Sequence, residues 1–322
     1  MKALMYLGIG QLGMREVPDP TDDFILKISG CGICGTDLKA YLKGHHMFTP
    51  PTILGHEFYG RVAKAPAGCG YKEGDLAVVA PYYECGVCGT CKNGAGELCQ
   101  NKAYVDGGAF CEYVGLASSY ISKGVFKLSA EDDVYTLVEP LACVLNGVSH
   151  LKLHASSRVL IVGSGPMGAL FALLFKARGI PCAVIEPAPL RRKMVASWGI
   201  EAYEPGAEGI GSYDNVVIAV NKAELFDQYL RGVSDAGTVL MFSGLKKEET
   251  VTLDSQSIHY REVTVTGSFG YALPQFREAL ELIKAHRETF EKVITHRLPL
   301  EEGQKGFDLL AAGEAFKIIL KP

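Results

Sequence analysis

The 322-residue sequence has little excess charge of either sign and no long apolar run. Lys and Arg number 32 against 36 Asp and Glu, a formal net charge of -4. A nucleic-acid-binding domain usually has a basic face, so this balance argues against a nucleic-acid partner. The longest apolar stretches, such as Val159–Val162 and Leu170–Phe175, are too short to span a bilayer. We therefore expect neither nucleic acid nor membrane among the partners.

The N-terminal segment also lacks the apolar core of a secretory signal peptide, because Gly8 and Gly10 follow soon after Met1. We therefore expect a cytoplasmic protein. In a reducing compartment, clustered cysteines are expected to bind metal rather than to form disulfides. The sequence has ten cysteines, and four of them lie between Cys85 and Cys99, a bunching that core packing does not explain.

The sequence divides into two parts with different patterns of apolar residues. Up to about residue 141, Gly and Pro interrupt short apolar runs, which is typical of β-strands and turns. Beyond that point strand-like runs alternate with helical stretches, which indicates βαβ units, a parallel sheet and an α/β fold. The expected strands and apolar runs are Phe24–Ile28, Leu76–Ala80, Tyr113–Leu116, Arg158–Val162, Cys182–Ile185, Val216–Val220, Thr238–Phe242, Val263–Thr266 and Ala315–Leu320, and the expected helices are Met167–Arg178, Leu190–Trp198 and Leu273–Lys284.

A glycine-rich motif joins one expected strand to the following helix. It reads Gly163-Ser164-Gly165-Pro166-Met167-Gly168, the pattern G-x-G-x-x-G. In a dinucleotide-binding loop the first Gly permits a tight turn, the second lets the backbone approach a pyrophosphate, and the third lets helix and strand pack closely. The helix N-terminus adds free N–H groups and a partial positive charge. The alternative is an ordinary glycine turn, which the strand–loop–helix context disfavours.

Glu186 ends the next expected strand, 18 residues after Gly168. A carboxylate at this position can accept hydrogen bonds from both hydroxyls of an adenine ribose, and it would repel a 2′-phosphate. We therefore expect NAD rather than NADP. Arg191 and Arg192 lie nearby and could partly compensate for a phosphate, which keeps NADP open as the alternative.

Cys85, Cys88, Cys91 and Cys99 have the spacing of a tight ligand cluster. Four thiolates around one ion suit a closed, tetrahedral structural zinc site. A [4Fe–4S] cluster is the rival, but there the fourth Cys usually follows after three residues and precedes Pro. Here the gap is seven residues and Gln100 follows. Zinc is favoured over the cluster and over four free thiols.

A second set of potential metal ligands is spread along the chain: Cys34, His56, Glu57 and Glu139. Each is weak evidence alone, but one thiolate, one imidazole and two carboxylates are enough for an open catalytic zinc. Such an ion acts as a Lewis acid that makes a substrate hydroxyl more acidic or a carbonyl more electrophilic.

Two side chains near Cys34 could assist this chemistry. The hydroxyl of Thr36 could take the substrate proton and relay it outward. Asp37 could orient His56 through the second ring nitrogen, as metal-bound histidines usually require. His45 and His46 precede a segment that could border the pocket, but a solvated loop is the favoured interpretation.

Taken in order, these segments resemble the medium-chain zinc-dependent alcohol dehydrogenase family over nearly the whole chain. The matching segments are Gly32-Ile33-Cys34-Gly35-Thr36-Asp37, Gly55-His56-Glu57, the four-cysteine lobe, Glu139-Pro140-Leu141-Ala142 and the glycine loop. The stretch at Glu139 is similar to the sorbitol and threonine dehydrogenase branch, where ethanol-type enzymes have a Cys ligand. In that branch the matching carboxylate binds zinc directly or through a water, and the one matching Glu57 can exchange in and out.

The resemblance also implies the fold. We expect a GroES-like β-rich catalytic domain at 1–141 and 268–322, with the zinc lobe at 85–99, and a doubly wound Rossmann domain at 142–267. Gly244 and the stretch Gly267-Ser268-Phe269 match the backbone that holds the nicotinamide in the family. Two zinc ions per chain, one catalytic and one structural, and a homodimer or homotetramer are implied as well.

One position departs from the family pattern. Many relatives have a His five residues after the zinc Cys, at the outer end of the proton relay, whereas this chain has Lys39. Either Lys39 serves with a lowered pKa, or the relay ends at Thr36, the ribose and water.

The sequence therefore predicts a zinc-dependent enzyme that reversibly oxidises a secondary alcohol, a sugar alcohol or related polyol, to a ketone with NAD. An amino alcohol such as threonine is the alternative substrate. A non-catalytic NAD and zinc redox sensor is a different class, disfavoured because a sensor needs no open zinc site. A zinc-ribbon nucleic-acid binder is disfavoured because the Cys85–Cys99 segment has one Lys and no Arg.

Overall fold

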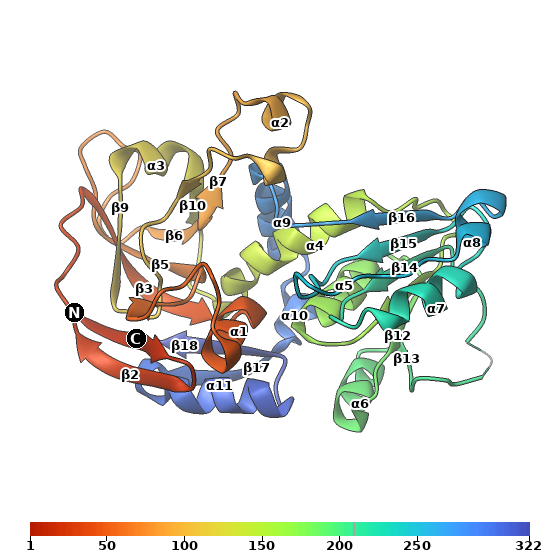
Figure 1. Ribbon diagram of the computed structural model, residues 1–322. Coiled ribbons are helices and arrows are strands. Elements are labelled where there is room, and N and C mark those ends of the chain that lie inside the picture. The colour runs from red at the N-terminus through yellow and green to blue at the C-terminus, as the bar shows by residue number, and fades with distance from the viewer. Residues whose placement is uncertain (209) are drawn as a thin grey trace. The chain divides into compact units, whose positions relative to one another are not determined.

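The computed structural model describes residues 1–208 and 210–322 (Figure 1). The chain divides into two compact units, one formed by Met1–Ala142 with Tyr271–Pro322 and the other by Cys143–Gly270. The second unit is thus an insertion in the first, and the first break falls inside helix α4 (Val138–Ser149). Among the described residues, no helix has both the length and the apolar character of a membrane span.

The first unit is built on a seven-stranded sheet in which β10, β6, β5, β3, β18 and β17 are neighbours in that order and β9 also pairs with β3. All these pairs are antiparallel except β17 with β18. The strands are β3 (Phe24–Gly32), β5 (Glu57–Lys64), β6 (Leu76–Val79), β9 (Tyr113–Leu116), β10 (Val125–Leu128), β17 (Ile294–Pro299) and β18 (Lys317–Lys321).

Shorter elements complete this unit. A three-stranded sheet has the order β2-β1-β4, and β7 pairs with β8. Their bounds are β1 (Lys2–Gly8), β2 (Gln11–Glu16), β4 (Thr52–Ile53), β7 (Tyr82–Tyr83) and β8 (Ala103–Tyr104). The helices are α1 (Gly35–Lys43), α2 (Gly89–Lys92), α3 (Ser118–Gly124), α9 (Leu273–Ala285), α10 (Arg287–Glu291) and α11 (Gly303–Ala312), with 3-10 turns η1 (Gly96–Leu98), η2 (Asp133–Leu137) and η3 (Leu300–Glu302).

Strand β3 is longer than its sequence predicts. Phe24, Leu26 and Ile28 alternate into the core, as expected for a strand with one buried face. The strand then continues to Gly32, because residues 30 to 32 pair with β5. A Cβ at Gly60 of β5 would collide with the carbonyl of Lys27, so the glycine allows this close pairing. The extension matters because Gly32 pairs with Glu57 and Cys34 follows two residues later.

The second unit contains a six-stranded, all-parallel sheet of order β13-β12-β11-β14-β15-β16. This is the doubly wound order of a Rossmann sheet, which reverses direction between the first and fourth strands along the chain. The elements are β11 (Val159–Val162), α5 (Pro166–Ala177), β12 (Cys182–Ile185), α6 (Pro189–Ser197), β13 (Glu201–Tyr203), β14 (Asn215–Ile218), α7 (Glu224–Gly232), β15 (Thr238–Met241), α8 (Ser255–Tyr260) and β16 (Thr264–Gly267). Every residue of β11 and β14 is buried, which explains their continuous apolar runs.

Several features of this unit were not predicted from the sequence: helices α7 and α8, strand β13 and the connection that follows it. Strand β13 is only three residues long and polar at its first residue, so it lacks an apolar signal. The connection from β13 to β14 has eleven residues, 204 to 214, and its described residues contain no helix. The remaining elements of this unit that the sequence predicts lie within two residues of their expected bounds.

Candidate metal and cofactor sites

Three predicted ligands meet in the first unit. The Cys34 sulfur, a ring nitrogen of His56 and a carboxylate oxygen of Glu57 all lie within 4.8 Å of one another. The pairing of β3 with β5 brings them together, because Cys34 follows β3 while His56 directly precedes β5 and Glu57 begins it. One thiolate, one imidazole and one carboxylate form the mixed ligand set of a catalytic zinc. This is a catalytic-type group of Cys, His and Glu.

Asp37 ties the two ligand segments together. Its fully buried carboxylate accepts hydrogen bonds from the backbone N–H of Cys34 at 3.0 Å and of Gly55 at 3.2 Å. The Oδ1 atom also lies 3.6 Å from Nδ1 of His56. Burial alone would lower the pKa of His56, but the negative charges of Asp37 and Cys34 outweigh it and hold that pKa well above its ordinary value. The negative charges around the His56 imidazole therefore favour a positive charge at the ring, either a proton or a metal ion.

Lys317 is a member of this site that the sequence analysis missed. Its Nζ donates to both carboxylate oxygens of Glu57, at 2.7 and 2.6 Å, and to the carbonyl of Ile33 at 3.3 Å. Lys317 and Glu57 are at most 1% exposed, so neither charge is satisfied by water. Burial by itself would lower the pKa of Lys317, but the negative charges of Glu57 and Cys34 outweigh this effect. The pKa of Lys317 is therefore raised above its ordinary value. The sequence did contain a signal for this residue, because Lys317 is a charged side chain inside the apolar run Ala315–Leu320.

The other predicted residues of this site are placed less tightly. Glu139 lies in the first turn of α4 and is 7% exposed, and it does not join the group of three ligand atoms. Its charge does act on Lys317, whose pKa it helps to raise. Thr36 and Lys39 lie in α1, where Thr36 is half-buried and Lys39 is exposed.

The four cysteines of the lobe converge on one point. Their sulfur atoms all lie within 4.8 Å of one another. The sulfur of Cys88 is 3.4 Å from that of Cys91 and 3.7 Å from that of Cys99, and Cys85 is 3.9 Å from Cys91. Four sulfurs at ~2.3 Å from a tetrahedral zinc would be separated by ~3.8 Å. The arrangement therefore fits a structural-type site of four cysteines.

Hydrogen bonds favour the thiolate at Cys85 and Cys88 of the lobe, whereas burial and the contact with Cys88 raise the pKa of Cys91 to about 12. The hydroxyl of Thr90 lies 3.1 Å from the Cys88 sulfur, and this contact with those of neighbouring groups lowers the pKa of Cys88 to about 5. Backbone N–H groups of Val87 and Cys88 donate to Cys85, and they lower its pKa. Zinc ligands must be deprotonated, so this backbone prepares the lobe for the metal.

In the second unit, the glycine loop follows β11 and opens α5. Gly163 has a φ of 94°, which only Gly adopts without strain. A Cβ at Gly168 would collide with the carbonyl of Gly163, so this glycine lets α5 pack on the loop. Around Gly165 a Cβ would meet nothing within 4 Å, which leaves its backbone open to a ligand. Pro166 and Met167 form the first turn of α5.

Glu186 is 4% exposed, directly after β12. One oxygen accepts hydrogen bonds from the N–H and the hydroxyl of Ser164, at 2.8 and 3.0 Å, and the other accepts from Ala188 N–H at 2.9 Å. The carboxylate is therefore held against the glycine loop. Arg192 donates to the carbonyls of Glu186 and Pro187, whereas Nε of Arg191 is buried without a hydrogen-bond partner among the described residues.

The residues predicted to hold a nicotinamide lie at and beyond the ends of β15 and β16. Gly267 pairs with Met241 as the last residue of β16, and Gly244 is exposed. Asn146, which the sequence analysis missed, donates to the Ser268 hydroxyl at 3.2 Å and to the carbonyl of Gly270 at 3.0 Å. The same amide nitrogen lies 3.4 Å from the carbonyl of Phe269, so one side chain contacts three consecutive residues of this segment. No local motif marks Asn146, because its partners lie over 120 residues away.

Comparison with known proteins decides the family. Residues 20–126 match the alcohol dehydrogenase GroES-like domain, and residues 166–285 match the zinc-binding dehydrogenase domain. The chain belongs to the medium-chain zinc-dependent alcohol dehydrogenase family. The first unit is therefore its GroES-like domain and the parallel sheet its Rossmann domain.

Individual family members differ in substrate and cofactor. A D-altritol 5-dehydrogenase of Agrobacterium fabrum is 29% identical, with 94% of each chain covered. An L-threonine 3-dehydrogenase of Bacillus velezensis is 28% identical, with 96% of this chain and 95% of that protein covered. The structure of a zinc-binding dehydrogenase from Sinorhizobium meliloti bound to NADP superposes with a TM-score of 0.85 at 29% identity, covering 100% of this chain and 99% of the other. The family is thus established as zinc-dependent NAD(P) dehydrogenases of alcohol and polyol type.

Proposed function

We propose that this enzyme reversibly oxidises a secondary hydroxyl of a sugar alcohol or related polyol to a ketone, with NAD as hydride acceptor. The observation that carries the proposal is the group formed by Cys34, His56 and Glu57, with Glu139 buried in the same unit. A carboxylate-containing zinc site supports a hydroxyl-rich substrate, and the D-altritol 5-dehydrogenase among the relatives supports the same class.

In this proposal, Cys34, His56 and Glu57 would hold the catalytic zinc, with Glu57 able to exchange in and out, and Glu139 would bind it directly or through a water. The ion supplies Lewis-acid polarisation of the substrate oxygen. Asp37 orients His56. When Glu57 is away from the metal, Lys317 pairs with its carboxylate. Cys85, Cys88, Cys91 and Cys99 hold the structural zinc.

Thr36 receives the substrate proton in the oxidising direction. Its half-buried position one residue into α1 supports this role. Lys39 is exposed one turn further along α1, where it can exchange protons with bulk water. It therefore stands as the outer end of the relay, in place of the family's His.

The glycine loop and Glu186 bind the adenosine part of NAD in the proposal. The ribose hydroxyls take the place of Ser164 and Ala188 as partners of the Glu186 carboxylate. A buried carboxylate repels a 2′-phosphate, which supports NAD. Arg191 contacts the adenosine, while Gly244, Gly267, Ser268 and Phe269 hold the nicotinamide. We also propose a homodimer or homotetramer.

The test is formation of NADH with a panel of polyols, simple secondary alcohols and L-threonine, on protein whose zinc content is assayed. We expect turnover on a polyol, lost on chelation and restored by zinc. L-Threonine belongs in the panel because of the 28% identical relative, and a higher kcat/KM on it than on every polyol would overturn the substrate assignment. Turnover that survives complete removal of zinc would overturn the mechanism.

A further inference from the structure

The second passage of the chain between the two units lies directly after the residues proposed to hold the nicotinamide. The first passage falls inside helix α4, whereas the second falls between Gly270 and Tyr271. Residues 268–270, here called the nicotinamide segment, come just before it, and the proposed function assigns Ser268 and Phe269 to the nicotinamide. The order of this short segment therefore depends on what holds the chain before and after it.

Within the second unit, the nicotinamide segment is held by one side chain. The amide of Asn146 donates to the Ser268 hydroxyl at 3.2 Å and to the carbonyl of Gly270 at 3.0 Å. The side chain of Phe269 is 70% exposed, so it adds little burial to this hold. A segment with few buried contacts opens at a low free-energy cost. An anchor directly after Gly270 reduces that freedom.

Within the first unit, Tyr82 provides such an anchor at the base of the four-cysteine lobe. The backbone N–H of Tyr271 donates to the Tyr82 hydroxyl at 3.0 Å, and the Tyr271 hydroxyl donates to the carbonyl of Tyr82 at 3.2 Å. The two rings are stacked, with their centroids 4.4 Å apart. Tyr271 is also buried, at 1% exposure. The first residue after the passage is therefore fixed by two hydrogen bonds and a stacked ring.

Glu84 holds the chain two residues further on, at the start of helix α9. Its carboxylate accepts a hydrogen bond from the backbone N–H of Leu273, the first residue of α9, at 3.0 Å. The first N–H groups of a helix have no partner within the helix, and a negative charge at this end is favourable. The lobe packs closely here, because a Cβ at Gly96 would lie 3.1 Å from both the Ala272 Cβ and the Glu84 Cγ. Glu84 directly precedes Cys85, so the anchor is part of the base of the lobe.

We propose that Tyr82 and Glu84 are positioning residues for the nicotinamide half of the cofactor. They fix the chain from Tyr271 onward, so that the nicotinamide segment is already ordered when the cofactor binds. Without this anchor the nicotinamide itself has to order part of the segment, and the lost conformational entropy lowers the affinity. The inference rests on the proposed function, which places the nicotinamide at this segment. The adenosine half, bound at the glycine loop, gains nothing from the anchor.

The experiment compares the binding of NADH with that of ADP-ribose, which lacks the nicotinamide, to the full zinc-loaded chain. Calorimetry gives both dissociation constants. For Glu84→Ala we expect the dissociation constant of NADH to rise about 5- to 10-fold, the effect of ordering about one residue, while that of ADP-ribose stays within about 2-fold. Glu84→Gln keeps an oxygen that can accept from Leu273 and should restore most of the affinity for NADH. An unchanged affinity for ADP-ribose also reports that the variant is folded.

A second variant tests the same anchor at another contact. Tyr82→Phe removes the hydroxyl that accepts from Tyr271 but keeps the stacked ring. It should raise the dissociation constant of NADH about 2- to 5-fold, the effect of one neutral hydrogen bond, and again spare ADP-ribose. Zinc analysis of both variants reports whether the lobe is intact, and we expect the zinc content of the wild-type protein.

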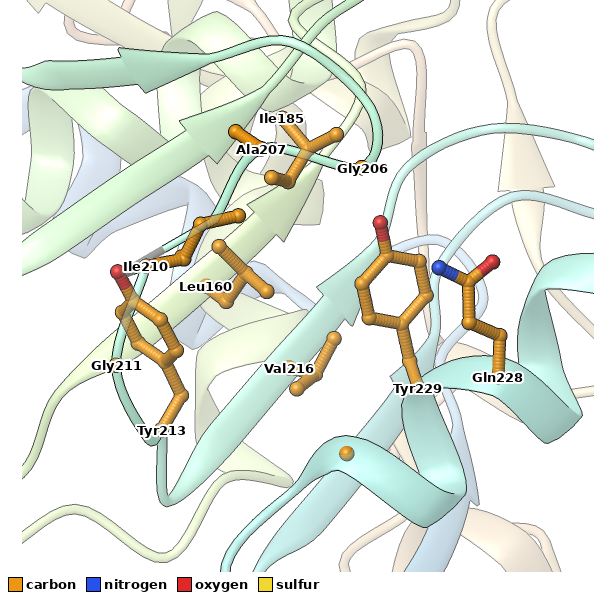
Figure 2. A pocket seen from close by; sticks show the side chains of 11 residues that line it. Leu160, Ile185, Gly206, Ala207, Ile210, Gly211, Tyr213, Val216, Gln228 and Tyr229 are labelled. Atoms are coloured by element: carbon orange, nitrogen blue, oxygen red, sulfur yellow. The ribbon is translucent and has the colours of Figure 1, made fainter.

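Two control variants change side chains elsewhere in each unit. Glu97→Ala removes another carboxylate of the lobe, in the turn η1. Gln228→Ala changes a residue of the second unit, on α7 beside the hollow that Figure 2 shows, which the nicotinamide segment does not line. Both variants should leave the two dissociation constants within about 2-fold of the wild-type values.

The outcomes separate the inference from the proposed function. If Glu84→Ala weakens NADH and ADP-ribose equally, or leaves NADH binding unchanged, the inference is overturned and the proposed function stands. If the wild-type protein binds NADH no more tightly than ADP-ribose, the nicotinamide gains nothing from the segment. In that case both the inference and the proposed placement of the nicotinamide are wrong.

Discussion

At the scale of single residues, the pair Glu57 and Lys317 shows how the metal site differs from a simple set of ligands. In the proposed mechanism Glu57 can leave the metal, and its buried carboxylate then needs a partner, since an unpaired buried charge is very costly. Lys317 supplies that partner from the far end of the chain, 260 residues away. The ligand set and its counter-charge therefore have to fold together.

Replacing Lys317 by Met should leave the buried Glu57 without a counter-charge. We expect the free energy of unfolding to fall by about 3–5 kcal/mol, as for other broken buried pairs. Urea denaturation of zinc-loaded protein measures it. Lys305→Met is the control, because its pair with Glu302 is exposed and should be worth less than about 1 kcal/mol. Equal losses in both variants would show that Lys317 does not neutralise Glu57.

Replacing Cys34 by Ser should abolish turnover with little effect on NADH binding, because the glycine loop belongs to the other unit. Steady-state kinetics and NADH fluorescence titration measure the two properties. Cys69→Ser changes a cysteine outside both metal groups and should retain full activity. Near-normal turnover of Cys34→Ser would remove Cys34 from the catalytic zinc.

Replacing Glu186 by Ala should lower kcat/KM for NAD about 10- to 100-fold, the value of hydrogen bonds to a charged group, and NADP use much less. The reason is that NAD loses the hydrogen bonds between its ribose hydroxyls and the Glu186 carboxylate. For NADP, the variant removes the repulsion between that carboxylate and the 2′-phosphate. Kinetics with both cofactors measure the ratio. Glu224→Ala, an exposed carboxylate in α7, should leave the ratio unchanged. Equal losses for the two cofactors would exclude Glu186 from cofactor selection.

At the scale of elements, the four-cysteine lobe is a metal-dependent segment of little regular structure. Helix α2 has four residues and η1 has three, too short to be stable alone. Its core is the cluster of sulfurs, so a zinc ion held by these cysteines, as we propose, would take the place of a hydrophobic core there.

Cys91→Ser should therefore remove one of about two zinc ions per chain and lower the melting temperature. Metal analysis and calorimetry measure these effects. Turnover per remaining catalytic zinc should be largely retained at low temperature, because this site is closed and performs no chemistry. A variant that keeps both zinc ions would show that Cys91 is not a ligand.

The turn η2 carries a second charged cluster of the first unit. The Asp133 carboxylate accepts hydrogen bonds from Tyr59 at 2.8 Å, Arg297 at 2.7 Å and Lys321 at 2.7 Å, which joins η2 to β5, β17 and β18. Burial would raise the pKa of Asp133, but these donors lower it below the ordinary value. A lowered pKa means that the unfolded chain binds the proton more tightly than the folded one.

The contribution of Asp133 to stability is thus complete above pH ~5 and is lost as the pH falls through the lowered pKa. We expect Asp133→Asn to cost about 1–3 kcal/mol at pH 7 and much less near pH 3. Urea denaturation at both pH values measures the difference. Asp235→Asn, at an exposed pair with Arg261, is the control and should cost less than about 1 kcal/mol at either pH. A cost of Asp133→Asn that does not depend on pH would contradict the assignment.

At the scale of the whole molecule, the order of motifs along the chain predicted much of the architecture. The Rossmann fold was readable because β11, β12, β14 and β15 are buried apolar runs and Gly punctuates the helices between them. Strand β13 was not readable, because a three-residue edge strand has no periodicity, and neither was the connection after it, whose described residues contain no helix.

The sequence by itself determined the chemistry of this protein: the ligand types, their spacing in the four-cysteine lobe, and the glycine loop with its acidic residue. These are local patterns, in which each residue type allows only certain chemistry. Only the tertiary structure decided which distant groups complete the sites, namely Lys317 on Glu57 and Asn146 on the segment after β16. Such contacts join residues from separate parts of the chain, and their geometry exists only when strand pairing and burial remove the alternative of water.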